Sequence, residues 1–215
     1  MKKSILLAIL MLCFPFYIMQ AKVGDAQNAK EAKALFNKIY AMVFGEQGSS
    51  LTYSVNIIGL YKTQGNILYK GKKLQYQESR YAAWEDGVTA YMVDKKKRKV
   101  RIHDFDDDAK DEYLSKFKYD VNNFDFSYRV DGGDYIIYAK LRKHSFFGIS
   151  KVEARVTRKT LIPQSLTIHL SLLKTTVKIT NFKSGGITDA SFVFPASLFK
   201  GYTFEDRRKN KHISL

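Results

Sequence analysis

Apolar and polar residues alternate along most of the chain after residue 50, and this period-two pattern predicts β-strands. In the clearest stretches every second residue is apolar: 51–57, 124–130, 152–157 and 166–171. Glycine-containing turns separate several of these stretches, as they do in antiparallel hairpins. We therefore expect about ten antiparallel strands, and a twisted sheet of that size usually curls.

One helix is expected before the strands, from Ala26 to Phe44. Its apolar positions recur with the i, i+3, i+4, i+7 spacing of a single helical face, and lysines occupy the other face. A second, short helix or ordered loop is expected within 104–119, where aspartates precede a small apolar stripe. The fold class is thus α+β, a curled antiparallel sheet with one or two helices covering its concave face.

Several local patterns carry further expectations. Gly59 and Gly65 are expected to interrupt the strand pattern with a bend or bulge. Residues 83–87 are expected to turn, and Phe192–Pro195 to be the last strand. The basic run Lys95–Lys99 lies between two apolar-alternating stretches, which predicts a hairpin tip, where lysine also deters edge pairing.

The N-terminus has the features of a secretory signal. Residues 1–21 contain a basic start, an apolar run and then small residues, and the run is too short to span a bilayer comfortably. An uncleaved anchor is the alternative. Cleavage is expected after residue 21, or as late as Ala26, so that 22–215 form a single domain. Cys13 is the only cysteine and lies within the apolar run, so we expect no lipid attachment and no disulfide.

The formal net charge of +15 favours anionic partners, but it does not point to nucleic acid in an exported chain. Most basic residues alternate with apolar ones, as on a solvated outer face. The four histidines lack partners at metal-ligand spacing and are interpreted as surface residues. We see no nucleophile motif or phosphate-binding loop. We therefore expect no metal, no cofactor and no enzymatic activity, with a hydrolase of dispersed site residues as the alternative.

Four segments resemble, in order and spacing, the periplasmic outer-membrane lipoprotein carrier (LolA-like) family. They are Lys73–Glu78, Trp84–Asp94, Phe192–Pro195 and Gly201–Arg207. The second contains an Asp-Gly before an aromatic strand, and the last two are similar to the family ending F-x-F-P followed by G-x-x-x-x-D. The resemblance covers nearly the whole mature chain. It implies an unclosed half-barrel whose concave, helix-covered face receives acyl chains.

The same resemblance implies a function in the periplasm. A carrier or chaperone of this family shields lipoprotein acyl chains during transfer to the outer membrane. Its partners are an inner-membrane lipoprotein-releasing transporter and an outer-membrane acceptor, and we expect this chain to act as a monomer without nucleic acid. The alternative is an exported protein-binding or regulatory module of the same fold that carries no lipid.

Site residues follow from the expected cavity. Those expected to line it are apolar positions of the helix and the strands: Leu35, Ile39, Met42, Val55, Leu68, Tyr91 and Phe126. A fully packed core built from the same residues is the alternative. The family carries an arginine that hydrogen-bonds to its helical lid, and Gln75 stands at that position here. Either a nearby lysine such as Lys73 supplies the lid latch, or the lid is held differently.

Overall fold

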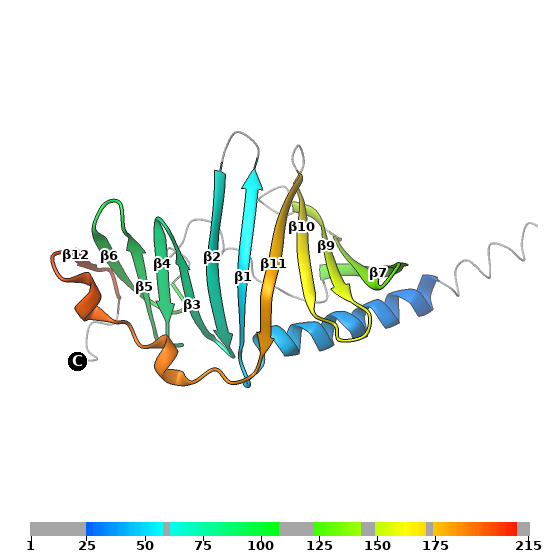
Figure 1. The fold of residues 1–215 in the computed structure, drawn as a ribbon, viewed down its shortest axis with the longest axis horizontal. Coiled ribbons are helices and arrows are strands. Elements are labelled where there is room, and N and C mark those ends of the chain that lie inside the picture. The colour runs from blue at the N-terminus through cyan, green and yellow to red at the C-terminus, as the bar shows by residue number, and fades with distance from the viewer. Residues whose placement is uncertain (1–24, 58–60, 108–122, 143–148, 171–173, 210–215) are drawn as a thin grey trace, which may run out of the picture.

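The computed structural model describes residues 25–57, 61–107, 123–142, 149–170 and 174–209 (Figure 1). The expected signal segment lies outside these ranges. The same holds for most of the second expected helix and for Gly59.

One helix occupies 25–44, and it is called the N-terminal helix below. Twelve strands follow in the described residues: β1 (Ser49–Ile57), β2 (Tyr61–Lys70), β3 (Lys73–Glu78), β4 (Tyr81–Glu85), β5 (Thr89–Asp94), β6 (Lys99–Asp104), β7 (Phe124–Asp131), β8 (Asp134–Leu141), β9 (Ile149–Thr157), β10 (Pro163–Leu170), β11 (Lys174–Ser184) and β12 (Thr203–Asp206). Two 3₁₀ helices, η2 (Asp189–Phe192) and η3 (Ala196–Phe199), precede β12.

All twelve strands belong to one sheet, in the order β12-β6-β5-β4-β3-β2-β1-β11-β10-β9-β8-β7. Every neighbouring pair is antiparallel except β12 and β6, which run parallel. The edge strands β7 and β12 do not pair with each other, so the curled sheet remains open. The expected α+β half-barrel is confirmed, with twelve strands where about ten were expected.

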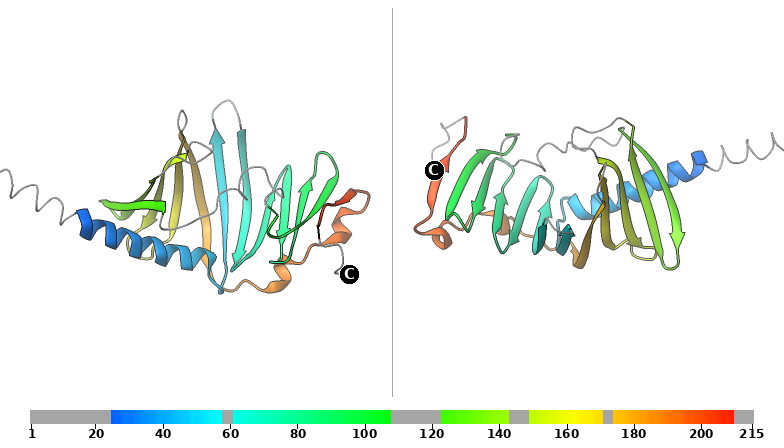
Figure 2. Two further views of the ribbon diagram at one scale, coloured as in Figure 1. Left: turned by 180° about the vertical axis from the view of Figure 1, so that it is seen from behind. Right: turned by 90° about the horizontal axis from the view of Figure 1, so that it is seen from above.

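The two faces of the sheet follow from its register, because directly paired residues point to the same side. One row crosses the sheet from Val55 through Val177 and Leu166 to Ala154 and Ile137. Ile137 packs against the N-terminal helix, so this whole row lies on the helix side. The sheet curls around the helix on that side, which is called the concave face below (Figure 2).

The N-terminal helix lies on the concave face and extends from edge strand β7 to β2, where Phe44 packs on Tyr69 with 4.6 Å between ring centroids. Its apolar side chains recur at helical spacing and pack on β7, β8 and β9: Ala32, Leu35, Phe36, Ile39 and Val43. Phe36, for example, lies with its ring centroid 5.2 Å from that of Phe126 in β7. Burial of this stripe fixes the helix to the sheet, since most of the stability of a helix in a protein comes from packing of its amphipathic face.

The C-terminal residues 189–206, called the cap below, cover the opposite face at the other end of the sheet. Trp84 in β4 lies under the rings of Phe194 and Phe199, with 5.6 Å between centroids in each case. Val93 and Val100 complete this second core. The helix and the cap therefore protect different faces of the sheet (Figure 2).

Three local expectations were wrong. Gly65 does not interrupt β2, which pairs with β1 without a shift in register. Residues 83–85 continue β4, and the turn begins only at Asp86, whose carboxylate accepts hydrogen bonds from two backbone N–H groups. The segment Phe192–Pro195 joins two 3₁₀ helices of the cap and is not a strand. The basic run was placed correctly, since 95–98 form the β5–β6 turn.

Candidate functional site

The middle of the concave face is lined by apolar side chains that are only half-buried. Seven such residues come from four adjacent strands: Val55, Val152, Ala154, Leu166, Ile168, Val177 and Ile179. None of them is among the described residues that pack against the helix. Neighbouring strands lie about 4.8 Å apart, so β9 to β1 span about 14 Å. We call this surface the apolar trough.

The trough begins where the helix contact ends. Ile137, which packs under the helix, is paired with Ala154, and Ala139 is paired with Val152. The helix therefore forms one wall beside the trough. Alternation along β9, β10 and β11 explains the surface, because every second residue of these strands is apolar and points to one side.

Hydrogen bonds to the sheet hold the helix at both ends. Asn28 Nδ2 donates to the carbonyl oxygen of Tyr128 in β7, and Asn28 Oδ1 accepts from the Tyr128 N–H, both at 2.9 Å. The Tyr128 hydroxyl donates to Glu31 at 2.8 Å, and hydrogen bonds from Gln27 and then Tyr128 lower the pKa of Glu31. At the other end, Ser49 Oγ donates to the carbonyl oxygen of Val43 at 2.7 Å.

Five of the seven expected lining residues lie on the helix or the concave face. Val55 lies in the trough, whereas Leu35, Ile39 and Phe126 pack between the helix and the sheet. Met42 is half-buried near the end of the helix, and its carbonyl oxygen accepts a hydrogen bond from Ser184 Oγ at 3.2 Å. The structure thus separates a packed part, under the helix, from a half-open part in the trough.

Leu68 and Tyr91 lie on the opposite face, away from the other five. Leu68 is paired with Ser50 and Gln75, whose side chains line a shallow polar groove. Tyr91 lies under the cap, where its ring stacks on that of Phe194 with 4.3 Å between centroids and 4° between planes. These two residues therefore belong to other surfaces than the trough.

The two expected latch residues also point away from the helix. The polar groove that contains Gln75 has a volume of about 390 Å³ and is lined by Ser50, Leu51, Thr52, Asn66, Leu68, Gln75, Gln77, Asn181 and Lys183. Lys73 Nζ lies 3.1 Å from Asp189 Oδ1 in η2, and Lys70 Nζ lies 2.9 Å from the same oxygen. Lys73 therefore forms an ion pair with the cap and does not contact the helix as a latch would. Asn28 is the residue that ties the helix to β7, and no sequence motif singled it out.

The concave face becomes polar toward β3 and β4. Glu78 is buried, and its Oε2 accepts hydrogen bonds from the hydroxyls of Tyr53, at 3.3 Å, and Thr63. Burial, with the nearby charges of Glu85 and Tyr53, raises the pKa of Tyr69 to about 12. The Tyr69 phenol thus stays protonated at any physiological pH. Glu78 therefore places a buried polar group on the concave face, whereas Tyr69 is half-buried and packs against Phe44 of the helix.

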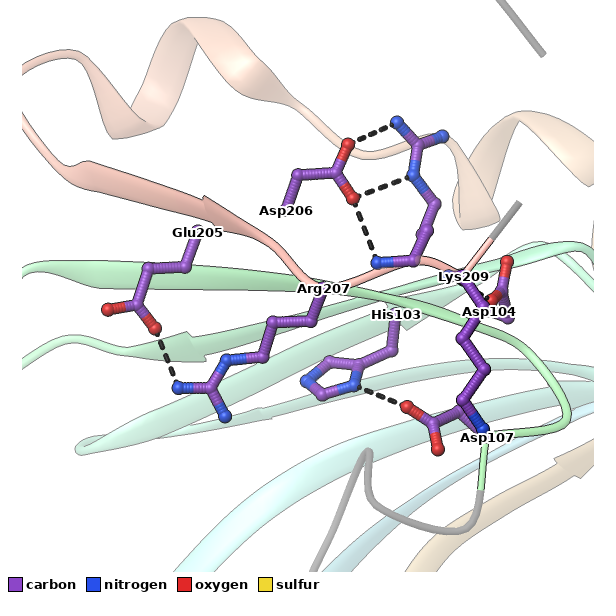
Figure 3. A network of polar contacts seen from close by, with 8 residues as sticks. His103, Asp104, Asp107, Glu205, Asp206, Arg207 and Lys209 are labelled. Atoms are coloured by element: carbon purple, nitrogen blue, oxygen red, sulfur yellow. Dashed lines mark hydrogen bonds and ion pairs between the residues drawn. The ribbon is translucent and has the colours of Figure 1, made fainter. Parts of the chain in front are cut away.

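His103 in β6 is buried on this polar side, whereas the sequence had indicated a surface histidine. Its Nδ1 lies 3.0 Å from Asp107 Oδ2 (Figure 3). His169 is half-buried and contacts Glu153 at 2.7 Å, and the other two histidines lie outside the described residues. Among the described ranges no group of three or more His, Cys, Asp or Glu side chains is arranged to hold a metal ion.

The chain matches no protein-family model, and no curated protein sequence matches it. Solved structures similar to it include a DUF1329 family protein from Desulfovibrio piger, with 16% identity over 79% of this chain and 98% of that one and a TM-score of 0.45. A LolA superfamily protein from Nitrosomonas europaea is 8% identical over 76% of this chain and 97% of that one, with a TM-score of 0.41. An outer membrane lipoprotein-sorting protein domain from Vibrio parahaemolyticus is 9% identical over 80% of this chain and 99% of that one, with a TM-score of 0.45.

Each identity is below 25%, so what those proteins bind is not carried over to this chain. In the described residues, no helix is both long and apolar enough to cross a membrane.

Proposed function

We propose that the chain binds acyl chains of a lipoprotein in the apolar trough and carries them across the periplasm to the outer membrane. The observation that carries this proposal is the set of seven half-buried apolar side chains in the middle of the concave face. Monomeric proteins rarely leave a contiguous apolar surface of this kind without a ligand or partner. An acyl chain is a flexible apolar ligand that a row of Val, Leu and Ile side chains fits.

The energetics suit a carrier. Burying a methylene contributes about 0.8 kcal/mol, so roughly eight buried carbons contribute about 6 kcal/mol before the costs of ordering the chain. That is enough to keep a lipid tail out of water, yet small enough for release to an acceptor. An open trough beside a helix needs no large rearrangement for the lipid to enter or leave.

A pair of neighbouring residues in β11 gives a matched test. Ile179 points into the trough, and Thr180 is exposed on the opposite face. Ile179→Asp places a charge in the trough and is expected to weaken uptake of a fluorescent fatty acid at least tenfold, because the carboxylate must lose water when the lipid binds. Thr180→Asp adds the same charge on the same strand and is expected to leave uptake unchanged.

A second variant separates lost binding from lost folding. Val177→Trp fills the trough with an indole and adds no charge, so it is expected to block uptake while the midpoint of thermal unfolding stays close to that of the wild type. Unchanged uptake by both trough variants, or no uptake by the wild-type protein, would rule out lipid binding here. The alternative module that carries no lipid would then be favoured.

Cargo and route are tested in the periplasm itself. Native mass spectrometry of the protein purified from its own periplasm is expected to detect bound lipoproteins with the wild type and to lose them with Val177→Trp. The proposed partners are an inner-membrane lipoprotein-releasing transporter and an outer-membrane acceptor. A single soluble protein that binds both forms equally would contradict the carrier role.

A further inference from the structure

The outer surface of the cap exposes three apolar side chains. Val193 is 67% exposed, Leu198 is 74% exposed and Phe204 is 46% exposed. Two of them are held outward because the next residue in the chain packs inward. Phe194 follows Val193 and stacks on Tyr91, and Phe199 follows Leu198 and packs on Trp84. The exposed residues therefore stand on a rigid base.

The basic hairpin turn lies directly beside this surface. The Thr203 N–H donates to the carbonyl oxygen of Arg98 at 2.9 Å, and the Arg98 guanidinium lies 5.3 Å from the centre of the Tyr202 ring. These contacts join residues 95–99 to the cap. Lys96 and Lys97 are exposed in the same turn.

The charge of the combined surface is strongly positive. Segments 95–99 and 193–209 contain nine basic and two acidic residues. Both acidic side chains are engaged. Glu205 contacts Lys99, and Asp206 contacts Arg208. Glu205 also contacts Arg207 (Figure 3). Of the remaining basic residues, Lys95 is half-buried and its Nζ donates to the carbonyl oxygen of Glu78. The other five are exposed: Lys96, Lys97, Arg98, Lys200 and Lys209.

We propose that the outer surface of the cap and the adjacent basic turn dock onto an anionic phospholipid bilayer. Apolar side chains that project from a rigid surface enter the boundary between headgroups and acyl chains, and lysines around them attract anionic headgroups. Charge complementarity selects this occupant over a neutral membrane. This surface lies on the face opposite the trough, so docking leaves the trough open toward the other side. The inference does not depend on lipid carriage.

Vesicle co-sedimentation tests the proposal with the full mature chain. The wild type is expected to bind vesicles made from an equal mixture of phosphatidylcholine and phosphatidylglycerol. It is expected to bind vesicles of pure phosphatidylcholine far more weakly. Binding is expected to fall as salt screens the surface charge. Lys96→Glu/Lys97→Glu is expected to weaken binding at least about tenfold, since each basic residue near the surface contributes to the attraction. Val193→Ser/Leu198→Ser is expected to weaken it by about tenfold as well.

Matched controls lie at the other end of the sheet. Val130→Ser removes an exposed valine from edge strand β7, and Lys33→Glu/Lys38→Glu makes the same charge change on the exposed side of the helix. Both are expected to bind vesicles like the wild type. Trp84 is the only tryptophan and packs under the cap, so its unchanged fluorescence checks that the cap of each variant stays in place.

Three outcomes would overturn the proposal. The first is failure of the wild type to bind anionic vesicles. The second is an equal loss with the control charge variant, which would assign binding to net charge alone. The third is a loss with Lys96→Glu/Lys97→Glu but none with Val193→Ser/Leu198→Ser, which would show that the apolar residues of the cap do not enter the bilayer.

Discussion

Asn28 forms two hydrogen bonds of 2.9 Å with the backbone of Tyr128, one as donor and one as acceptor. β7 is an edge strand, and its outward N–H and C=O groups need partners. The side-chain amide of Asn28 supplies both, as a neighbouring strand would. The helix is thereby joined to the sheet at its first turns, which sets its place beside the trough.

Removing this amide should loosen the start of the helix. Asn28→Ala is expected to lower the free energy of unfolding by about 1 kcal/mol, since water reaches the exposed edge and replaces part of the lost bonding. Amide hydrogen exchange in the first turns of the helix should become faster. Asn37→Ala changes an exposed asparagine of the same helix and is the control. Equal exchange rates in the two variants would count against a latch at Asn28.

Gly65 allows Tyr53 to lie across β2. A Cβ at this position would stand 2.3 Å from the carbonyl oxygen of Gln77 and 2.9 Å from the Tyr53 ring. Gly65→Ala is therefore expected to destabilise the fold by about 1–3 kcal/mol in urea unfolding. Gly133→Ala, whose Cβ would meet nothing within 4 Å, should change stability by less than about 1 kcal/mol. Similar costs for the two substitutions would disprove the close contact.

The cap should loosen in acid. Hydrogen bonds from Lys70 and then Lys73 lower the pKa of Asp189. A carboxyl with a lowered pKa in the folded state stabilises the fold above its unfolded pKa of about 3.9, and that stability is lost as the pH falls through the folded value. Urea unfolding of wild type and Asp189→Asn should therefore differ slightly at neutral pH and converge in acid. The difference should also shrink in salt, because the pair is exposed. A difference that persists in strong acid would contradict this assignment.

The sequence pattern predicts the faces of strands where apolar and polar residues strictly alternate. Val177 and Ile179 in β11 are flanked by polar residues, and alternation places both on the concave face. Where several apolar residues follow one another, the period is ambiguous. Ile67, Leu68 and Tyr69 are consecutive in β2, and Ala90 to Val93 are all apolar in β5. The faces of Leu68 and Tyr91 therefore became clear only from the register.

Contacts between segments far apart in sequence were beyond the reach of local patterns. The sequence predicts a strand at Phe192–Pro195, yet Phe194 packs on Tyr91 and Phe199 in the cap. The parallel pairing of β12 with β6 joins residues about a hundred positions apart, and so does the contact of Asn28 with Tyr128. Such pairings depend on the whole fold, because no local period encodes them.

A methyl NMR titration with a spin-labelled fatty acid tests the central claim most directly. The paramagnetic label broadens methyl signals close to the bound acyl chain. We predict that the signals of Leu166, Ile168, Val177 and Ile179 are broadened. Ile136, buried on the opposite face in β8, should be broadened less. Unchanged trough signals at saturating fatty acid, or equal broadening of Ile136, would contradict acyl-chain binding in the trough.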